Sequence, residues 1–148
     1  MFITEPHIEI EYIDGRIWKL LSQVIYLCEE AFAEQPAGRV IHVPKGFVTD
    51  FASVPRLFWN VLAPTGKHSF AAIVHDYLYY RGEIEDGVPC TKAYADLVFR
   101  EALREAGVNK VRRNLMYWAV KYFGNGVWDT RQEQAGARRQ RARSARAS

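Results

Sequence analysis

The sequence predicts an α+β fold, with a small N-terminal antiparallel sheet followed by three to four packed helices. Three observations support this class. The first fifty residues alternate apolar and polar side chains, the spacing then becomes helical, and turn-forming residues separate the segments. With 148 residues, 49% of them hydrophobic, the chain can bury a core without disulfides or a metal.

The expected strands lie in the first fifty residues. Residues 7–13 have the period-two alternation of a half-buried strand, and Asp14-Gly15 is a strong hairpin signal directly after them. The other β-rich runs are residues 16–20, 23–28, 39–43 and 45–50. Together these runs predict one antiparallel sheet of four or five strands.

Helical spacing replaces the strand pattern after the first fifty residues. Three polar residues, Ser53, Thr91 and Asn109, are placed to cap helix N-termini. The expected helices are a short one from Ser53 to about residue 63, then residues 69–80, 92–106 and 110–123. The acidic segment 83–89 is expected to be a loop.

Positive charge is concentrated at the C-terminus. Residues 130–148 carry six arginines and one acid, whereas the whole chain has a net charge of +3, so residues 1–129 are mildly acidic. We therefore expect one α+β domain over 1–129 and a basic Arg/Ala-rich tail over 130–148, either helical or disordered. A uniformly basic nucleic-acid-binding domain is excluded. Any affinity for nucleic acid would come from the tail, which could also bind an anionic lipid surface, and a simple solvated terminus is the alternative.

Cysteine usage and hydropathy bear on the compartment. Two free thiols, Cys28 and Cys90, in a reducing cytoplasm are favoured over one disulfide. The N-terminus lacks the features of a secretory signal, and no apolar run approaches the roughly 20 residues that a membrane span requires. We expect a protein made in the cytoplasm with no transmembrane segment.

A histidine and an aspartate, His75 and Asp76, lie side by side in an apolar helical segment. Adjacent helix positions diverge by about 100°, so the two side chains should reach different partners. If the helices 69–80 and 92–106 are antiparallel neighbours, Asp96 can hydrogen-bond His75 and orient it as a general base, while Asp76 holds a cation. The alternative is a buried structural His–Asp pair, with Asp76 solvated at the rim.

The junction between the sheet and the first helix contributes further candidates. Asp50 would add a carboxylate oxygen to a cation held by Asp76. Ser53 would be a nucleophile with His75 as its base. The alternatives are that Asp50 or Ser53 is only a helix cap, and that Arg56 pairs with a nearby acid.

Two more residues of the helical region are candidates. His68 lies two turns before His75, so a site with two histidines and one acid is an option for a divalent cation such as zinc. Tyr79 belongs to a set of aromatic residues in 77–128. These either form a ligand-stacking surface or pack in the core, and their helical spacing favours the core.

Several separated motifs occur in order along the chain. They are GFVTDFASVPR at residues 46–56, AAIVHDYLY at 71–79, ADLVF at 95–99 and MYWAV at 116–120. Over residues 40–128 the chain resembles an uncharacterised domain family of tailed bacteriophages and prophages, often encoded among virion and tail genes. The resemblance implies a phage origin, other virion or tail proteins as partners, and a location in the host cytoplasm during synthesis and then in the virion.

The pattern AAxxHDxxY followed by ADxxF is more distantly similar to the core of phospholipase A2, particularly the domain of parvovirus capsids. The resemblance implies that His75 is the general base for a water, that Asp96 orients it, and that Asp76 binds calcium. Tyr79 is then the motif tyrosine, and host envelope lipid is the partner. The glycine-rich calcium loop of that family is missing upstream of His75, so Asp50 would replace its ligands.

Two hypotheses of function result. The first is a small phage hydrolase that acts on an ester or phosphoester of the cell envelope, with calcium or zinc as the possible cation. The second is a non-enzymatic virion component, such as a tail-tip or tail-assembly protein, in which the His/Asp cluster is structural. A metal-dependent phosphohydrolase of the His-Asp type ranks below both, because its histidine ligands lack convincing spacing.

Overall fold

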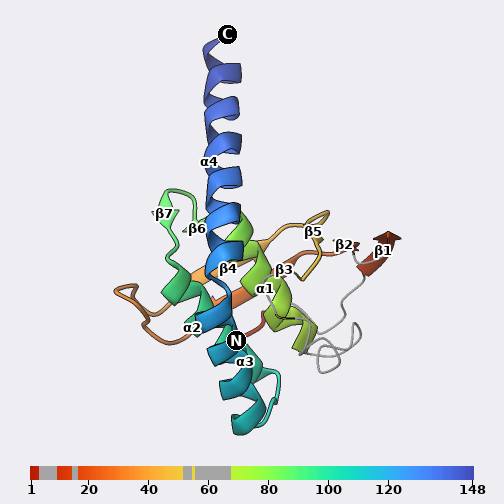
Figure 1. Ribbon diagram of the computed structural model, residues 1–148, viewed down its shortest axis with the longest axis vertical. Helices are drawn as coiled ribbons and strands as arrows, with labels where there is room; N and C mark the ends of the chain where they lie inside the picture. Colours follow the sequence, from red (N-terminus) through yellow and green to blue (C-terminus); the bar gives the residue numbers. More distant parts are fainter. Residues whose placement is uncertain (4–9, 15–16, 52–54, 56–67) are drawn as a thin grey trace.

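The computed structural model describes residues 1–3, 10–14, 17–51, 55 and 68–148, and it confirms the α+β class (Figure 1). Strands β1 to β5 come first and the helices follow, with β6 and β7 between α1 and α2. The strands are β1 (Ile10–Asp14), β2 (Ile17–Leu20), β3 (Val24–Cys28), β4 (Arg39–Val43), β5 (Val48–Thr49), β6 (Glu83–Glu85) and β7 (Val88–Pro89). The helices are α1 (His68–Arg81), α2 (Lys92–Glu105), α3 (Lys110–Phe123) and α4 (Asn125–Ala147).

The N-terminal strands form two sheets, so the expectation of one continuous sheet is wrong. β1, β2 and β5 make a three-stranded antiparallel sheet, and β3 pairs with β4 in a separate one. In β3 the inward residues Val24, Tyr26 and Cys28 are buried, which is the predicted period of two. The pairing of β1 with β2 fits the hairpin signal.

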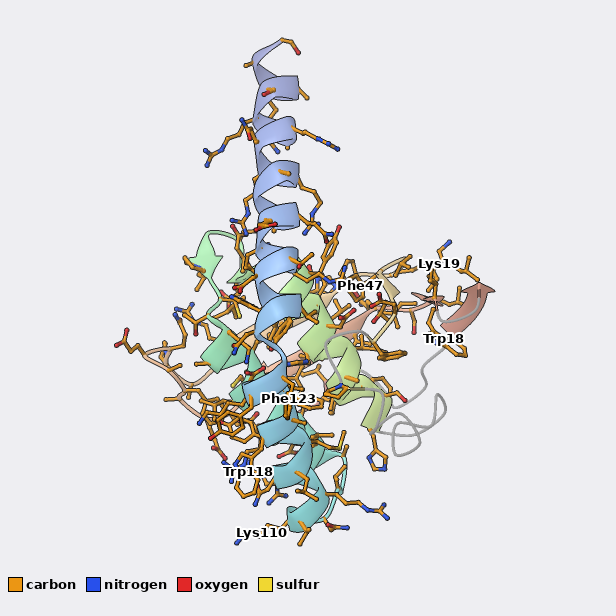
Figure 2. All side chains as sticks on the ribbon, in the orientation of Figure 1. Trp18, Lys19, Phe47, Lys110, Trp118 and Phe123 are labelled. Carbon is orange, nitrogen blue, oxygen red and sulfur yellow. The ribbon has the colours of Figure 1, made fainter. Side chains whose placement is uncertain are left out.

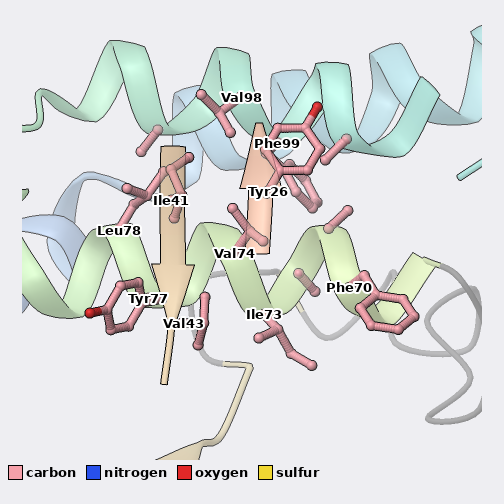
Figure 3. Packing of buried hydrophobic residues seen from close by; sticks show 14 of the residues in the cluster. Tyr26, Ile41, Val43, Phe70, Ile73, Val74, Tyr77, Leu78, Val98 and Phe99 are labelled. Atoms are coloured by element: carbon pink, nitrogen blue, oxygen red, sulfur yellow. The ribbon is translucent and has the colours of Figure 1, made fainter. Parts of the chain in front are cut away.

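Helix α1 is the centre of the fold. Its residues Ser69–Tyr79 are all buried, because the β3–β4 sheet, α2 and α4 cover different sides of it. Figure 3 shows the result, with Val74 and Leu78 of α1 meeting Ile41 of β4 and Phe99 of α2 in one core. A helix that is apolar on every side belongs in a protein interior, where each polar side chain requires a partner.

The helix ends agree with the sequence signals. Thr91 accepts a hydrogen bond from the backbone N–H of Tyr94 at 3.1 Å, and Asn109 accepts one from Arg112 at 3.0 Å. The segment 83–89, expected to be a loop, contains the β6–β7 hairpin instead. The short helix expected after Ser53 lies outside the described residues.

Helix α4 contains the basic C-terminal segment, and its first half lies against the end of α1. Gln132 Nε2 donates to the carbonyl of Tyr79 at 3.0 Å, and Arg139 Nη2 donates to that of Arg81 at 2.8 Å. Arg138 donates to the Tyr80 carbonyl and stacks on the ring of Tyr80. These bonds satisfy carbonyls at the α1 C-terminus, which have no partner within the helix. The far end of α4 projects away from the rest of the molecule (Figure 1).

We predict that Gly82→Ala destabilises the fold more than Gly87→Ala. Both glycines have positive φ, +67° and +78°, but an added Cβ at Gly82 would overlap the Gln132 side chain and lie 2.9 Å from Arg139 Nη2. At Gly87 nothing lies within 4 Å. Backbone strain alone costs about 1 kcal/mol, so we expect roughly 1 kcal/mol for Gly87→Ala. Gly82→Ala should cost about 1 kcal/mol more, because Gln132 and Arg139 must move away from the carbonyls that they bond. Urea unfolding measures both, and equal losses would contradict the docking of α4.

Candidate functional site

The site is built where α1 and α2 pack against each other. The two helices run in opposite directions, since Gly82 contacts Cys90 while the ring of His75 contacts Phe99. His75 Nε2 lies 2.8 Å from Asp96 Oδ1, so the contact expected from antiparallel packing is present. Both side chains are buried, His75 at 0% and Asp96 at 2% exposure.

Asp96 accepts hydrogen bonds from two further donors. Tyr79 Oη donates to Oδ1 at 2.7 Å, and Lys92 Nζ donates to Oδ2 at 2.7 Å. Burial favours a raised pKa for Asp96, but the hydrogen bond and charge of His75 and the bonds from Lys92 and Tyr79 outweigh it. The pKa of Asp96 therefore lies below its usual value, and the group is a carboxylate that orients His75.

Lys92 links this cluster to a third helix. Its Nζ also donates to the backbone carbonyls of Val120 at 2.9 Å and Lys121 at 3.0 Å, in the last turn of α3. The spacing of Lys92 and Asp96 by four residues in α2 was a signal for this ion pair that sequence reasoning missed. Asp96 is thus held by groups from α1 and α2, and Lys92 connects it to α3.

Asp76 reaches a different set of partners, as the angle between adjacent helix positions predicts. Thr49 Oγ1 donates to Asp76 Oδ2 at 2.5 Å, whereas Asp76 Oδ1 is buried and has no hydrogen-bond partner among the residues that the structure describes. Burial raises the pKa of Asp76. The Thr49 bond and the charges of Arg131 and His75 oppose this rise, and the charge of Asp50 adds to it.

Arg131 of α4 already brings a positive charge to this position. Its Nη2 lies 3.1 Å from Asp50 Oδ1, and its charge also acts on Asp76. Sequence reasoning placed Arg131 in the tail and missed this role, because nothing local to the tail indicates which acid it reaches. The charge of Asp50 acts on Asp76 as well, so the two acids and Arg131 influence one another electrostatically.

The other candidates contribute less to this cluster. His68 begins α1 and its buried Nδ1 has no hydrogen-bond partner, but among the described residues no group of three or more His, Cys, Asp or Glu side chains is arranged to hold a metal. Tyr79 is part of both the core and the site, through its bond to Asp96. Ser53 and Arg56 lie outside the described residues, so their roles stay predictions.

A second buried acid, Glu101 of α2, was not a candidate from the sequence. Its carboxylate accepts from Tyr26 Oη at 2.5 Å and from the backbone N–H groups of Glu29 and Glu30, both at 3.3 Å. Cys28 Sγ is 3.8 Å from it. These bonds tie α2 to the end of β3.

Both cysteines are free and buried. Burial raises the pKa of Cys90 to about 12 and also raises the pKa of Cys28. Neither thiol is therefore an activated nucleophile at neutral pH.

Comparison with known proteins identifies a family but no activity. A family described as "Protein of unknown function (DUF1353)" matches residues 19–120, and the chain belongs to it. The match contains His75, Asp76 and Asp96, and it ends before α4.

One curated relative is the "Uncharacterized protein y4jT" of Sinorhizobium fredii (strain NBRC 101917 / NGR234). It is 29% identical over 93 residues, which are 62% of this chain and 26% of the relative. The chain thus spans about a quarter of the length of that protein. No solved structure matches the chain.

We predict that Asp76→Asn changes the pH dependence of stability. The raised pKa of Asp76 means that, above about pH 4, the unfolded chain loses this proton before the folded chain does. The contribution of Asp76 to stability is therefore full below that pH and falls as pH rises through the folded pKa.

The Asn variant lacks this fall, so its stability relative to the parent should increase with pH. Urea unfolding in a chelating buffer measures the difference, with Asp129→Asn on the exposed side of α4 as the control. Parallel curves for the parent and Asp76→Asn would contradict the raised pKa.

Proposed function

We propose that the chain is a small phage-encoded hydrolase, related in mechanism to phospholipase A2, with an ester or phosphoester of the cell envelope as its substrate. The observation that carries the proposal is the network in which Asp96 accepts hydrogen bonds from both His75 and Tyr79. A carboxylate that orients a histidine is the arrangement of a general base. The phage setting is supported only by the resemblance of the separated sequence motifs.

The residues of this chain would act as follows on a carboxylic ester. His75 takes a proton from a water as the water oxygen attacks the ester carbon, and Asp96 stabilises the resulting imidazolium. The ester C–O bond then breaks, and the departing alcohol takes the proton from His75. The products are a carboxylic acid and an alcohol, and His75 returns to its starting state.

Access is the main physical requirement of this proposal. His75 is completely buried, so water and substrate reach the imidazole only when the packing around it opens. Burial also strengthens the electrostatic effect of Asp96, because fewer water molecules screen it. The reaction therefore requires an opening step before chemistry.

The donor set supports a divalent cation at Asp76 and Asp50. Asp76 Oδ1 is a buried oxygen without a hydrogen-bond partner in the described part of the chain, and carboxylate oxygens are the ligands that calcium prefers. A cation bound by these residues would supply positive charge that stabilises a developing oxyanion. Arg131 now supplies positive charge beside the same two acids, so it competes with a cation for Asp50.

The second candidate is a non-enzymatic virion component, such as a tail-tip or tail-assembly protein. The observation that favours it is the complete burial of His75 together with the bonds from Lys92 to the end of α3. In that case the His/Asp cluster stabilises the helices and contacts no substrate.

We predict that His75→Gln and Asp96→Asn each reduce hydrolysis by at least about 100-fold, the usual contribution of a general base. The measurements are fatty-acid release from fluorogenic phosphatidylglycerol vesicles and alcohol release from a soluble phosphodiester. His42→Gln is the control, because His42 is exposed and its hydrogen-bond partner is Gln23 rather than a residue of the His/Asp cluster. Circular dichroism and urea unfolding establish that each variant is folded. If the parent hydrolyses neither substrate, the virion alternative replaces the enzyme.

We predict that the chain binds calcium or zinc at Asp76 and Asp50, and that Arg131→Gln binds the cation more tightly. The reason is that the variant lacks the positive charge of Arg131, which lies 3.1 Å from Asp50, acts on Asp76 and would repel a cation. Isothermal titration calorimetry on the parent, Arg131→Gln and Asp76→Asn measures the affinities, and Asp76→Asn should abolish binding. No binding by the parent or by Arg131→Gln at about 1 mM of either cation would contradict this part of the proposal.

A further inference from the structure

Helix α3 presents an apolar stripe to solvent. Val111, Leu115, Trp118 and Tyr122 are each between 47% and 69% exposed, and Phe123 at the end of the helix is 79% exposed. Successive residues in a helix are about 100° apart, so the first four fall within a stripe about 60° wide. Figure 2 places Lys110, Trp118 and Phe123 along this helix at one end of the molecule.

The stripe is not the face that holds α3 in the fold. Met116, Ala119 and Val120 are the buried residues of α3, and the helix packs on α2 through its inner side. Five of the eleven large hydrophobic residues that are exposed in the described part of the chain belong to α3. A concentration of this kind on one helix indicates a contact surface.

The charged residues of α3 are all positive. α3 contains Lys110, Arg112, Arg113 and Lys121 and no acid. By the same helical angles, Lys110 and Lys121 lie along one edge of the stripe and Arg112 lies along the other. Lys121 Nζ is also 5.5 Å from the ring centre of Tyr122, which places the charge beside the aromatic surface.

We infer that this face of α3 binds an anionic phospholipid surface. The apolar stripe inserts at the boundary between headgroups and acyl chains, and the flanking cations contact lipid phosphates. Trp and Tyr favour that depth of a bilayer. A second copy of the chain is a poorer occupant, because pairing two such faces brings Lys110, Lys121 and Arg112 against their equivalents. The inference depends on α3 alone and is independent of the hydrolase proposal.

Sedimentation with vesicles tests the inference. The probe is vesicles of phosphatidylcholine with about a quarter phosphatidylglycerol, compared with pure phosphatidylcholine. The double variant Trp118→Ser/Tyr122→Ser should bind the anionic vesicles roughly tenfold more weakly, because it loses the inserted aromatic surface. Ile13→Ser is the matched control, since Ile13 is 51% exposed on β1. Binding should fall as salt screens the cations, and pure phosphatidylcholine should bind weakly.

Three outcomes would overturn the inference. They are equal binding by the parent and the double variant, no binding to anionic vesicles, or a concentration-dependent dimer in analytical ultracentrifugation that the double variant abolishes. Repeating the sedimentation with His75→Gln separates binding from catalysis. Retained binding by that variant supports the inference whether or not the chain is an enzyme. All of the α3 substitutions are at exposed positions, so the fold should be preserved, and circular dichroism verifies this.

Discussion

The carboxylate of Asp96 is the group on which the helical half of the molecule depends. A buried charge is costly unless donors surround it, and Asp96 has them from His75, Tyr79 and Lys92. Two of these donors come from α1, and Lys92 continues to the carbonyls that end α3. One acid therefore fixes the relative position of three helices. Removing any donor weakens the compensation for the same buried charge, so the cluster acts as a unit.

Asp76, next to His75 in the same helix, is in the opposite situation. Both acids are almost completely buried, yet the pKa of Asp96 is lowered and the pKa of Asp76 is raised. Both oxygens of Asp96 accept hydrogen bonds, whereas one oxygen of Asp76 has no hydrogen-bond partner among the described residues. Titratable groups whose surroundings move their pKa values apart are typical of acid–base sites, although structural ion pairs have similar effects. The incomplete bonding of Asp76 is the feature that a purely structural cluster explains least well.

Local signals were sufficient to predict the helices and part of the site. The caps at Thr91 and Asn109 located the starts of α2 and α3, and antiparallel packing brought His75 to Asp96. The β6–β7 hairpin was missed because each strand is too short to show alternation. The division of the strands into two sheets depends on pairing between distant segments, which no local pattern specifies. Arg131 was missed for the same reason, since its partner lies 81 residues away.

The arginines of the basic C-terminal segment have two different roles, and the composition of the segment does not indicate which arginine has which role. Arg138 and Arg139 bond the carbonyls that end α1, where the helix dipole also favours positive charge. Arg131 of the same segment forms an ion pair with Asp50, and its charge also acts on Asp76. The part of α4 up to Arg139 therefore compensates charges and carbonyls of the folded body and influences the site directly. Only the projecting end, with Arg141, Arg143 and Arg146 exposed, is left as a basic arm available to an anionic partner.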